Sequence, residues 1–229
     1  MSASAKEKII TALDVSHIAA AESVLDELEG IATWCKIGMQ LFTKEGPPAV
    51  AMAKSRGFRV FLDLKFHDIP NTVASAARSA AELGADMLTI HLSGGPEMIR
   101  AAVDAAPGVC ILGVSVLTSS SAETLAAVGI PHTPETWVPS LARLGAECGI
   151  GGIVCSPLEI EAVRAAAGPD VRIVTPGVRP AGADIGDQKR VLTPAAAIAA
   201  GADYLVVGRP ILAARDRRAA FEAIAAELA

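Results

Sequence analysis

Charged residues gather where short apolar runs end. Asp63 and Lys65 lie two residues apart at the end of one run, Asp14 follows an earlier run, Lys36 lies within another, and Asp68 comes three residues after Lys65. Residues two apart on a strand project to the same face, so Asp63 and Lys65 are predicted to point the same way. A lysine flanked by carboxylates stays protonated, because nearby negative charge favours the charged form. Such an ammonium is a poor Schiff-base nucleophile and a good proton donor.

A structural ion-pair network is the alternative interpretation of these charges. Burying charge is costly unless it is paired and hydrogen-bonded, and two lysines with three aspartates can satisfy one another. Four of the charged positions, however, lie on three consecutive strand ends. That concentration favours a reaction site over a purely structural network.

Glycine and arginine occur together twice near the C-terminus. Gly177-Val178-Arg179 follows one apolar run and Gly208-Arg209 follows the next. Glycines allow a close backbone approach and arginines offer bidentate contacts, a combination suited to phosphate. Two surface arginines beside turn glycines are the alternative, but the doubled pattern argues against it. The polar, glycine-rich stretch 181–190 is a candidate closing lid, from which Gln188 could reach the phosphate.

Short apolar runs alternate with alanine-rich helical stretches along the whole chain. The runs are nearly continuous, which is typical of parallel strands covered on both faces by helices. The predicted strands span Ile9–Val15, Ala32–Gly38, Arg59–Leu64, Met87–Leu92, Cys110–Leu117, Gly152–Cys155, Arg172–Thr175 and Tyr204–Gly208. The predicted helices span Ile18–Leu28, Pro47–Arg56, Thr72–Leu83, Pro96–Ala105, Pro134–Cys148, Pro157–Ala167, Pro194–Ala200 and Arg217–Leu228.

Eight strands alternating with helices in 229 residues predict an α/β fold, the (β/α)8 TIM barrel. A doubly wound open sheet is the alternative, but its glycine-rich first turn is absent after the first strand. No linker or composition break divides the chain, so residues 1–229 are expected to form a single domain. In such a barrel the C-terminal strand ends hold the active site, and the last two loops commonly bind phosphate. Both residue patterns would therefore face one cavity.

Weaker candidates lie at the same end of the barrel. The run Thr118–Ser121 closes the fifth strand and is either a plain flexible loop or a segment whose first members hydrogen-bond a ligand. His91 ends the fourth strand and His67 precedes Asp68, and both are better interpreted as structural histidines.

Composition excludes several classes of protein. The net charge of −5 and the 3% aromatic content argue against a general nucleic-acid binder, which needs basic surface and stacking aromatics. No apolar run approaches the roughly 20 residues of a membrane span, and the first residues lack the apolar stretch of a signal peptide, so a cytoplasmic setting is expected. The four cysteines have no metal-ligand spacing, and three of them lie in or beside strand-like runs, so they are expected to be buried thiols. No metal or nucleotide cofactor is predicted.

At these residues the sequence closely resembles the orotidine 5′-monophosphate decarboxylase family. The ten-residue run Asp63-Leu64-Lys65-Phe66-His67-Asp68-Ile69-Pro70-Asn71-Thr72 carries the most specific match. Further matches, in the family's order, are Leu13-Asp14, Lys36-Ile37-Gly38, Pro176-Gly177-Val178-Arg179, Asp187-Gln188-Lys189-Arg190 and Val207-Gly208-Arg209-Pro210. The alanine-rich, short chain looks bacterial.

The resemblance implies conversion of orotidine 5′-monophosphate to UMP and CO2, the last step of de novo UMP synthesis, without a cofactor. It makes Lys65 the proton donor to C6 of the pyrimidine and places Asp63 against the substrate carboxylate. Lys36 and Asp68 complete the charged network, and Asp68 and Thr72 enter from the partner subunit of a homodimer. The other implied contacts are Asp14 with the ribose hydroxyls, Thr118 with the pyrimidine, and Arg179, Gln188, Gly208 and Arg209 with the phosphate.

Two other functions fit parts of the pattern. Sugar-phosphate decarboxylases of the same barrel superfamily, such as the 3-keto-gulonate 6-phosphate type, share Asp-x-Lys-x-x-Asp but use Mg²⁺. The run from Phe66 to Thr72 favours the orotidine interpretation. A catalytically silent barrel that senses a phosphorylated ligand would be free to lose Lys65 or Asp63, and both are present.

Overall fold

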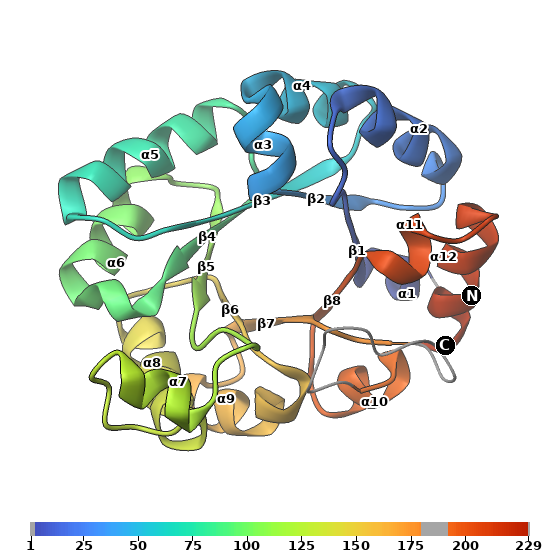
Figure 1. The fold of residues 1–229 in the computed structure, drawn as a ribbon. Coiled ribbons are helices and arrows are strands. Elements are labelled where there is room, and N and C mark those ends of the chain that lie inside the picture. Colours follow the sequence, from blue (N-terminus) through green and yellow to red (C-terminus); the bar gives the residue numbers. More distant parts are fainter. Residues whose placement is uncertain (1–2, 180–191, 229) are drawn as a thin grey trace.

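Eight parallel strands close into a barrel in a computed structural model that describes residues 3–179 and 192–228 (Figure 1). Each strand pairs with the next, and the eighth pairs with the first. The strands are β1 (Ile9–Ala12), β2 (Trp34–Gly38), β3 (Arg59–Phe66), β4 (Met87–His91), β5 (Cys110–Val114), β6 (Gly152–Val154), β7 (Arg172–Pro176) and β8 (Tyr204–Val207). The predicted TIM barrel is confirmed.

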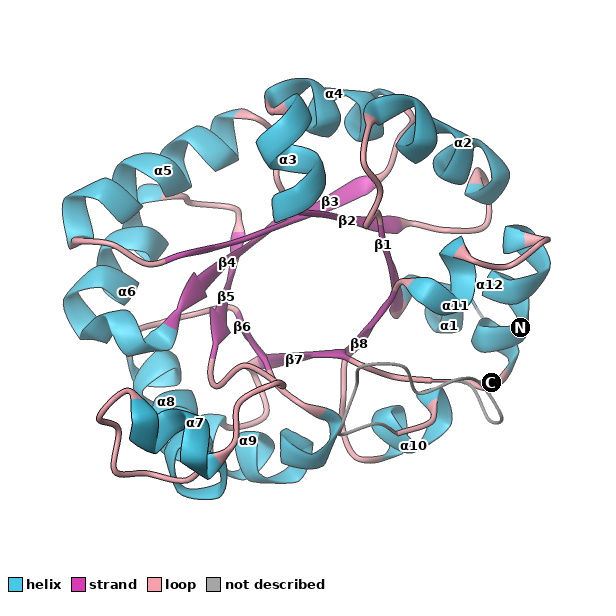
Figure 2. Cartoon of the chain, viewed as in Figure 1, coloured by secondary structure: helices cyan, strands magenta, loops and turns pink. Residues whose placement is uncertain are grey.

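Helices surround the barrel on its outer side (Figure 2). They are α1 (Ala3–Glu7), α2 (Ile18–Leu28), α3 (Met39–Glu45), α4 (Pro47–Ser55), α5 (Pro70–Glu82), α6 (Gly95–Ala105), α7 (Ala122–Ala127), α8 (Pro134–Glu147), α9 (Ile160–Ala167), α10 (Pro194–Ala199), α11 (Arg209–Leu212) and α12 (Arg217–Ala226), with 3-10 turns at Leu92–Gly94 and Pro157–Glu159. Within the described part of the chain, none is long and apolar enough to cross a membrane.

Two apolar cores explain why each strand is a nearly continuous run of apolar residues in the sequence. The larger core lies between the barrel and its helices, and Leu62 and Leu64 of β3 belong to it or pack against it. The smaller core fills the barrel interior and includes Ile10, Phe61 and Met87. Successive strand residues alternate between these two cores, so both faces of each strand are apolar.

Several element boundaries differ from the sequence prediction. β1 ends at Ala12 instead of Val15, because the chain turns away after the Leu13 amide donates to the Lys36 carbonyl at 2.9 Å. β5 ends at Val114 instead of Leu117, since the next amide is 3.5 Å from its acceptor on β6. β3 continues past Leu64 to Phe66.

Helix boundaries also shift at their starts. α5 begins at Pro70 rather than Thr72, with proline in the first turn where its missing N–H costs nothing. The predicted helix Pro157–Ala167 divides into a 3-10 turn and α9, and Ser156 and Glu159 form a capping box at the start of the turn.

Candidate active site

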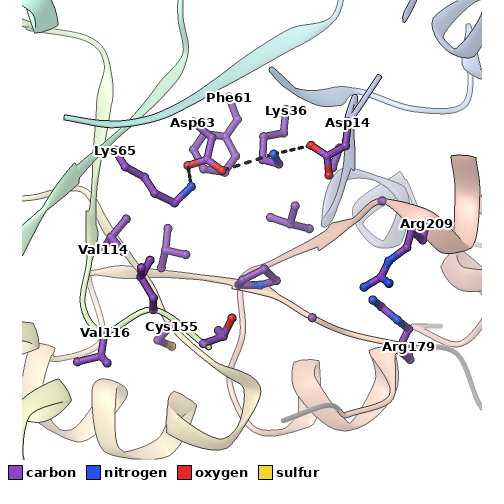
Figure 3. Close-up of a pocket in the computed structure, with 18 residues that line it drawn as sticks. Asp14, Lys36, Phe61, Asp63, Lys65, Val114, Val116, Cys155, Arg179 and Arg209 are labelled. Carbon is purple, nitrogen blue, oxygen red and sulfur yellow. Dashed lines mark hydrogen bonds and ion pairs between the residues drawn. The ribbon is translucent and has the colours of Figure 1, made fainter. Parts of the chain in front are cut away.

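A cavity of about 290 Å³ opens at the C-terminal ends of the strands, where both residue patterns were predicted to meet (Figure 3). Its walls combine charged, apolar and glycine positions from seven of the eight strands or the loops that follow them. The lining residues are Ala12, Asp14, Lys36, Phe61, Asp63, Lys65, Val114, Val116, Leu117, Thr118, Val154, Cys155, Pro176, Gly177, Arg179, Val206, Gly208 and Arg209.

Four of the predicted charges form one continuous chain across the cavity. The Lys65 ammonium lies 2.7 Å from Oδ1 of Asp63, and the Lys36 ammonium lies 3.4 Å from Oδ2 of the same carboxylate. Lys36 also donates to Oδ1 of Asp14 at 3.1 Å. The side chain of Asp63 is only 13% exposed, whereas that of Asp14 is 57% exposed. Positive and negative groups therefore alternate from the buried side of the cavity to its rim.

The Asp63 carboxylate is held ionised. Burial is the largest single influence and opposes ionisation, but the ammonium groups of Lys36 and Lys65 and hydrogen bonds from Lys65 and Thr89 together outweigh it. The pKa of Asp63 consequently lies below its ordinary value.

Lys65 has an unusual backbone conformation. Its φ of 53° makes it the only non-glycine residue with a positive φ in the described ranges 3–179 and 192–228. Such conformations cost roughly 1–3 kcal/mol and persist where the surroundings impose them. The pairing of β3 with β4 shifts register here: Leu62 pairs with Leu88 but Phe66 pairs with Ile90, so four steps on β3 oppose two on β4. The bulge turns the catalytic candidate toward the cavity.

Gly38 makes room for the Lys36–Asp14 ion pair. A Cβ at Gly38 would lie 2.9 Å from the Lys36 ammonium nitrogen and 3.5 Å from Oδ1 of Asp14. Because Gly38 has a φ of −95° at the start of α3, space rather than backbone conformation accounts for glycine here.

The second residue pattern forms the opposite side of the cavity. Arg179 and Arg209 both line it, and Figure 3 shows their guanidinium groups close to one another. Gly177 and Gly208 line the same wall, which leaves their backbone open to a ligand. Arg179 is buried and Arg209 is exposed. Gln188 and the predicted lid 181–190 lie outside the described residues.

Asp68 and Thr72 are not brought into this cavity. Asp68 is exposed, and its Oδ1 accepts a hydrogen bond from the Ile69 amide at 2.6 Å. Thr72 is exposed in the first turn of α5. The chain's own fold thus presents both residues on its surface, beside Ile69, whose side chain is also exposed.

The weaker candidates separate into different roles. Thr118 lines the cavity, whereas Ser121 caps α7 by accepting from the Thr124 amide at 3.3 Å. His67 and His91 face each other with ring centroids 5.5 Å apart. Burial, followed by the charges of His67 and Lys65, lowers the pKa of His91.

The cysteines correct one sequence expectation. Cys35, Cys148 and Cys155 are buried, but Cys110 is only partly buried, because it begins β5 at the opposite mouth of the barrel. All four are unpaired. Among the described residues, no group of three histidine, cysteine, aspartate or glutamate side chains could hold a metal ion.

Comparison with known proteins identifies the family. Residues 7–224 match the model of the orotidine 5′-phosphate decarboxylase / HUMPS family. The chain belongs to this family. It is 53% identical over 234 residues to orotidine 5′-phosphate decarboxylase of Moorella thermoacetica, covering 98% of this chain and 93% of that protein. It is 56% identical over 223 residues to the Anaeromyxobacter dehalogenans protein of the same name, covering 97% and 98%.

A solved structure shares the fold of this family member. The crystal structure of orotidine 5′-phosphate decarboxylase from Lactobacillus acidophilus superposes with a TM-score of 0.86 at 35% identity, covering 97% of this chain and 99% of that one.

The apolar part of the site was not predicted from the sequence. Phe61, Val114 and Val154 line the cavity, but in the sequence they are ordinary strand residues. Their alternation with outward-facing neighbours is the signal that could have identified them. Thr89 was missed as well: it is fully buried behind Asp63 and lies inside an apolar strand run.

Proposed function

We propose that this cavity is where the chain decarboxylates orotidine 5′-monophosphate to UMP, with Lys65 as the proton donor. The observation that carries the proposal is the Lys65 ammonium, fixed 2.7 Å from the ionised Asp63 at one side of a cavity that has two arginines at the other. A substrate with a charged reacting group at one end and a phosphate at the other matches that arrangement.

The phosphate end fixes the substrate. Arg179 and Arg209 offer guanidinium donors, and Gly208 leaves its backbone accessible. We assign Gln188 to the same phosphate. Binding energy from this remote group holds the pyrimidine against the charged residues, where it contributes to the rate rather than to affinity alone.

The ribose and the base lie between the two ends. Asp14, half exposed at the rim and paired with Lys36, can accept hydrogen bonds from ribose hydroxyls. Thr118 can hydrogen-bond the pyrimidine from the loop after β5. The aromatic side chain on the cavity wall is Phe61, so charge and hydrogen bonding dominate recognition.

The reaction transfers one proton. The bond between C6 and the carboxylate carbon breaks, CO2 leaves, and the electron pair stays on C6. The Lys65 ammonium stabilises that developing charge because it is already in position, and it then donates its proton to C6. Lys65 becomes a neutral amine and takes a new proton from water. Asp63, which lies against the substrate carboxylate, and Lys36 keep the array oriented throughout.

We also propose that a second copy of the chain completes the site. Asp68 is exposed in the loop between β3 and α5, and Thr72 is exposed in the first turn of α5. Neither residue lines the cavity of its own chain. Ile69 between them exposes 66% of its surface, which suits a segment that docks on another subunit. In a homodimer these residues would enter the partner's cavity. A cytoplasmic setting suits the four unpaired cysteines.

The experiment is an assay of the purified protein with orotidine 5′-monophosphate in the presence of EDTA. The absorbance of the orotate ring should fall as UMP forms. EDTA should not prevent this, because the proposed step uses Lys65 and no metal. Unchanged absorbance would refute the activity. A rate that appears only after Mg²⁺ is added would favour a sugar-phosphate decarboxylase.

A further inference from the structure

Thr89 lies directly behind the charged array without lining the cavity. It is the middle residue of β4 and is fully buried. Its neighbours Leu88 and Ile90 face the outer core, while Met87 faces the barrel interior. The alternation of strand residues therefore turns the Thr89 side chain inward, toward β3 and the underside of Asp63.

One hydroxyl connects two parts of the array. Oγ1 of Thr89 accepts a hydrogen bond from the Lys65 amide at 2.9 Å and donates to Oδ1 of Asp63 at 3.0 Å. A threonine hydroxyl has a single proton to donate. The carboxylate must accept, and the amide must donate, so the direction of both hydrogen bonds is fixed.

The same carboxylate oxygen also binds the Lys65 side chain. Oδ1 of Asp63 receives the Lys65 ammonium at 2.7 Å. The main chain of Lys65, the Thr89 hydroxyl, Asp63 and the Lys65 ammonium thus form a closed ring of interactions. The Lys65 amide binds the Thr89 hydroxyl, and the Lys65 ammonium binds the carboxylate oxygen to which the same hydroxyl donates.

The backbone explains why such a fixation is needed. At the bulge, four steps on β3 oppose two steps on β4, so the Lys65 amide has no ordinary ladder partner opposite it. Lys65 also has the positive φ of 53°. A buried amide requires an acceptor, and a strained conformation persists only where contacts impose it. The Thr89 hydroxyl supplies both.

We propose that Thr89 is a positioning residue for proton transfer, which holds the Lys65 main chain and the Asp63 carboxylate in register. The inference rests on the function proposed above. Thr89 touches no substrate; it acts by keeping the Lys65 ammonium at one place relative to C6. A purely structural threonine would affect folding without affecting the proton-transfer step.

The test compares three substitutions. Thr89→Val keeps the shape and removes the hydroxyl, whereas Thr89→Ser keeps the hydroxyl. Thr11→Val is the matched control, because Thr11 is a fully buried strand threonine whose hydroxyl has no hydrogen-bond partner in the described part of the chain. Thr89→Val should lower kcat by about tenfold to a hundredfold, as expected when a catalytic group is misplaced by about 1 Å, with KM changed less than about threefold. Thr89→Ser should stay within about threefold of wild type in kcat, and Thr11→Val should match wild type.

A second readout needs no substrate. The charged groups facing Asp63 are Lys36 on β2 and Lys65 on β3, with His91 at the end of β4 close enough to be influenced by Asp63 and with Asp14 beyond Lys36. All of these remain in the variant. Loss of the Thr89 hydrogen bond should therefore raise the pKa of Asp63, measured by carbon-13 NMR titration of the ligand-free protein, and shift the acid limb of the kcat profile to higher pH.

The outcomes are distinguishable. Wild-type kcat in folded Thr89→Val, an unchanged Asp63 pKa, or an equal loss in Thr89→Ser would each overturn the positioning role. If Thr89→Val does not fold, Thr89→Ser is compared with Thr89→Cys, which differs from it only by sulfur in place of oxygen. Equal kcat in these two variants would also overturn the positioning role. If the wild type does not act on orotidine 5′-monophosphate, the proposed function fails while the titration still tests the role of Thr89.

Discussion

At the scale of single residues, the charged array works because every charge is neutralised by a neighbour. Asp63 is nearly buried and would be costly to ionise alone, yet Lys36 and Lys65 flank it on both oxygens. In the proposed mechanism the array is therefore already polarised before substrate arrives, and no group has to reorganise when charge develops on C6.

Asp63 should make a pH-dependent contribution to stability. Its folded-state pKa is lowered, so its stabilising effect is complete above the unfolded value of about 3.9 and is lost as pH falls through the lower, folded value. Asp63→Asn should lower the free energy of unfolding at pH 7 by about 3 kcal/mol, because Lys65 loses its ion pair with Asp63 and Lys36 keeps only the one with Asp14.

The measurement is urea unfolding of wild type and Asp63→Asn between neutral and acidic pH. All other carboxylates are common to both proteins, so the difference isolates Asp63. The difference in the free energy of unfolding between the two proteins should narrow as pH drops below about 4. A gap that stays constant, or widens, would show that Asp63 is not stabilised as a carboxylate.

Arg209 should recognise the phosphate. Arg209→Ala should raise KM for orotidine 5′-monophosphate by about tenfold to a hundredfold, since hydrogen bonds to charged groups contribute about 1.5–3 kcal/mol. Turnover of the phosphate-free nucleoside should change little. Arg215→Ala, an exposed arginine outside the cavity lining, is the control. Equal losses with both substrates would remove Arg209 from the phosphate site.

The sequence predicted the charged residues of the cavity but not what supports them. Asp14, Lys36, Asp63 and Lys65 could be found because ionisable residues at strand ends are conspicuous. Thr89 could not, since a threonine in an apolar strand is ordinary and its importance depends on the bulge opposite it. The strained Lys65 backbone depends on the same bulge.

At the scale of elements, strands were predictable and short helices were not. All eight strands were expected, because each is buried on both faces. The short helices α1, α3, α7 and α11 were missed, since four to seven residues are too few for a periodic apolar pattern. The exact strand ends also depend on where hydrogen bonding to the neighbour stops, which the sequence does not encode locally.

The junction between β2 and α3 offers a test of element geometry. Gly38→Ala would place a Cβ 2.9 Å from the Lys36 ammonium, and the flexible end of Lys36 should move away from Asp14. We expect kcat/KM to fall by about tenfold while Tm changes by less than about 2 °C, because the backbone at Gly38 accommodates alanine.

Steady-state kinetics and thermal unfolding of the same preparation check this expectation. Unchanged kcat/KM would mean that the position of Lys36 is not critical. A large fall in Tm would mean that Gly38 serves the fold rather than the site.

At the scale of the whole molecule, closure of the barrel brings residues from both ends of the chain to one cavity. Pairing of β1 with β8 places Asp14 beside Gly208. A Cβ added at Gly208 would lie 3.4 Å from Oδ2 of Asp14. The assignment of residues 1–229 to one domain remains a prediction. Asp68 and Thr72 do not line the cavity and are exposed on the surface of the single chain.

Mixed dimers test whether those residues come from a second copy. Lys65→Ala and Asp68→Ala subunits, each inactive alone, should regenerate activity when refolded together, because every hybrid dimer holds one intact site. Random mixing should recover about a quarter of wild-type activity, since about half of the dimers are hybrids with one of two sites intact. No recovery, with hybrid formation verified by mass spectrometry, would argue that each subunit carries a complete site.

The measurement that tests the central claim most directly is turnover of orotidine 5′-monophosphate by Lys65→Ala, together with binding of UMP to the same protein. We expect decarboxylation to become undetectable, because the substitution removes the ammonium at Oδ1 of Asp63 and Lys36 lies at the other oxygen, between Asp63 and Asp14. UMP binding should stay within about tenfold of wild type through the phosphate contacts. Substantial turnover by folded Lys65→Ala would contradict the assignment of Lys65 as the proton donor.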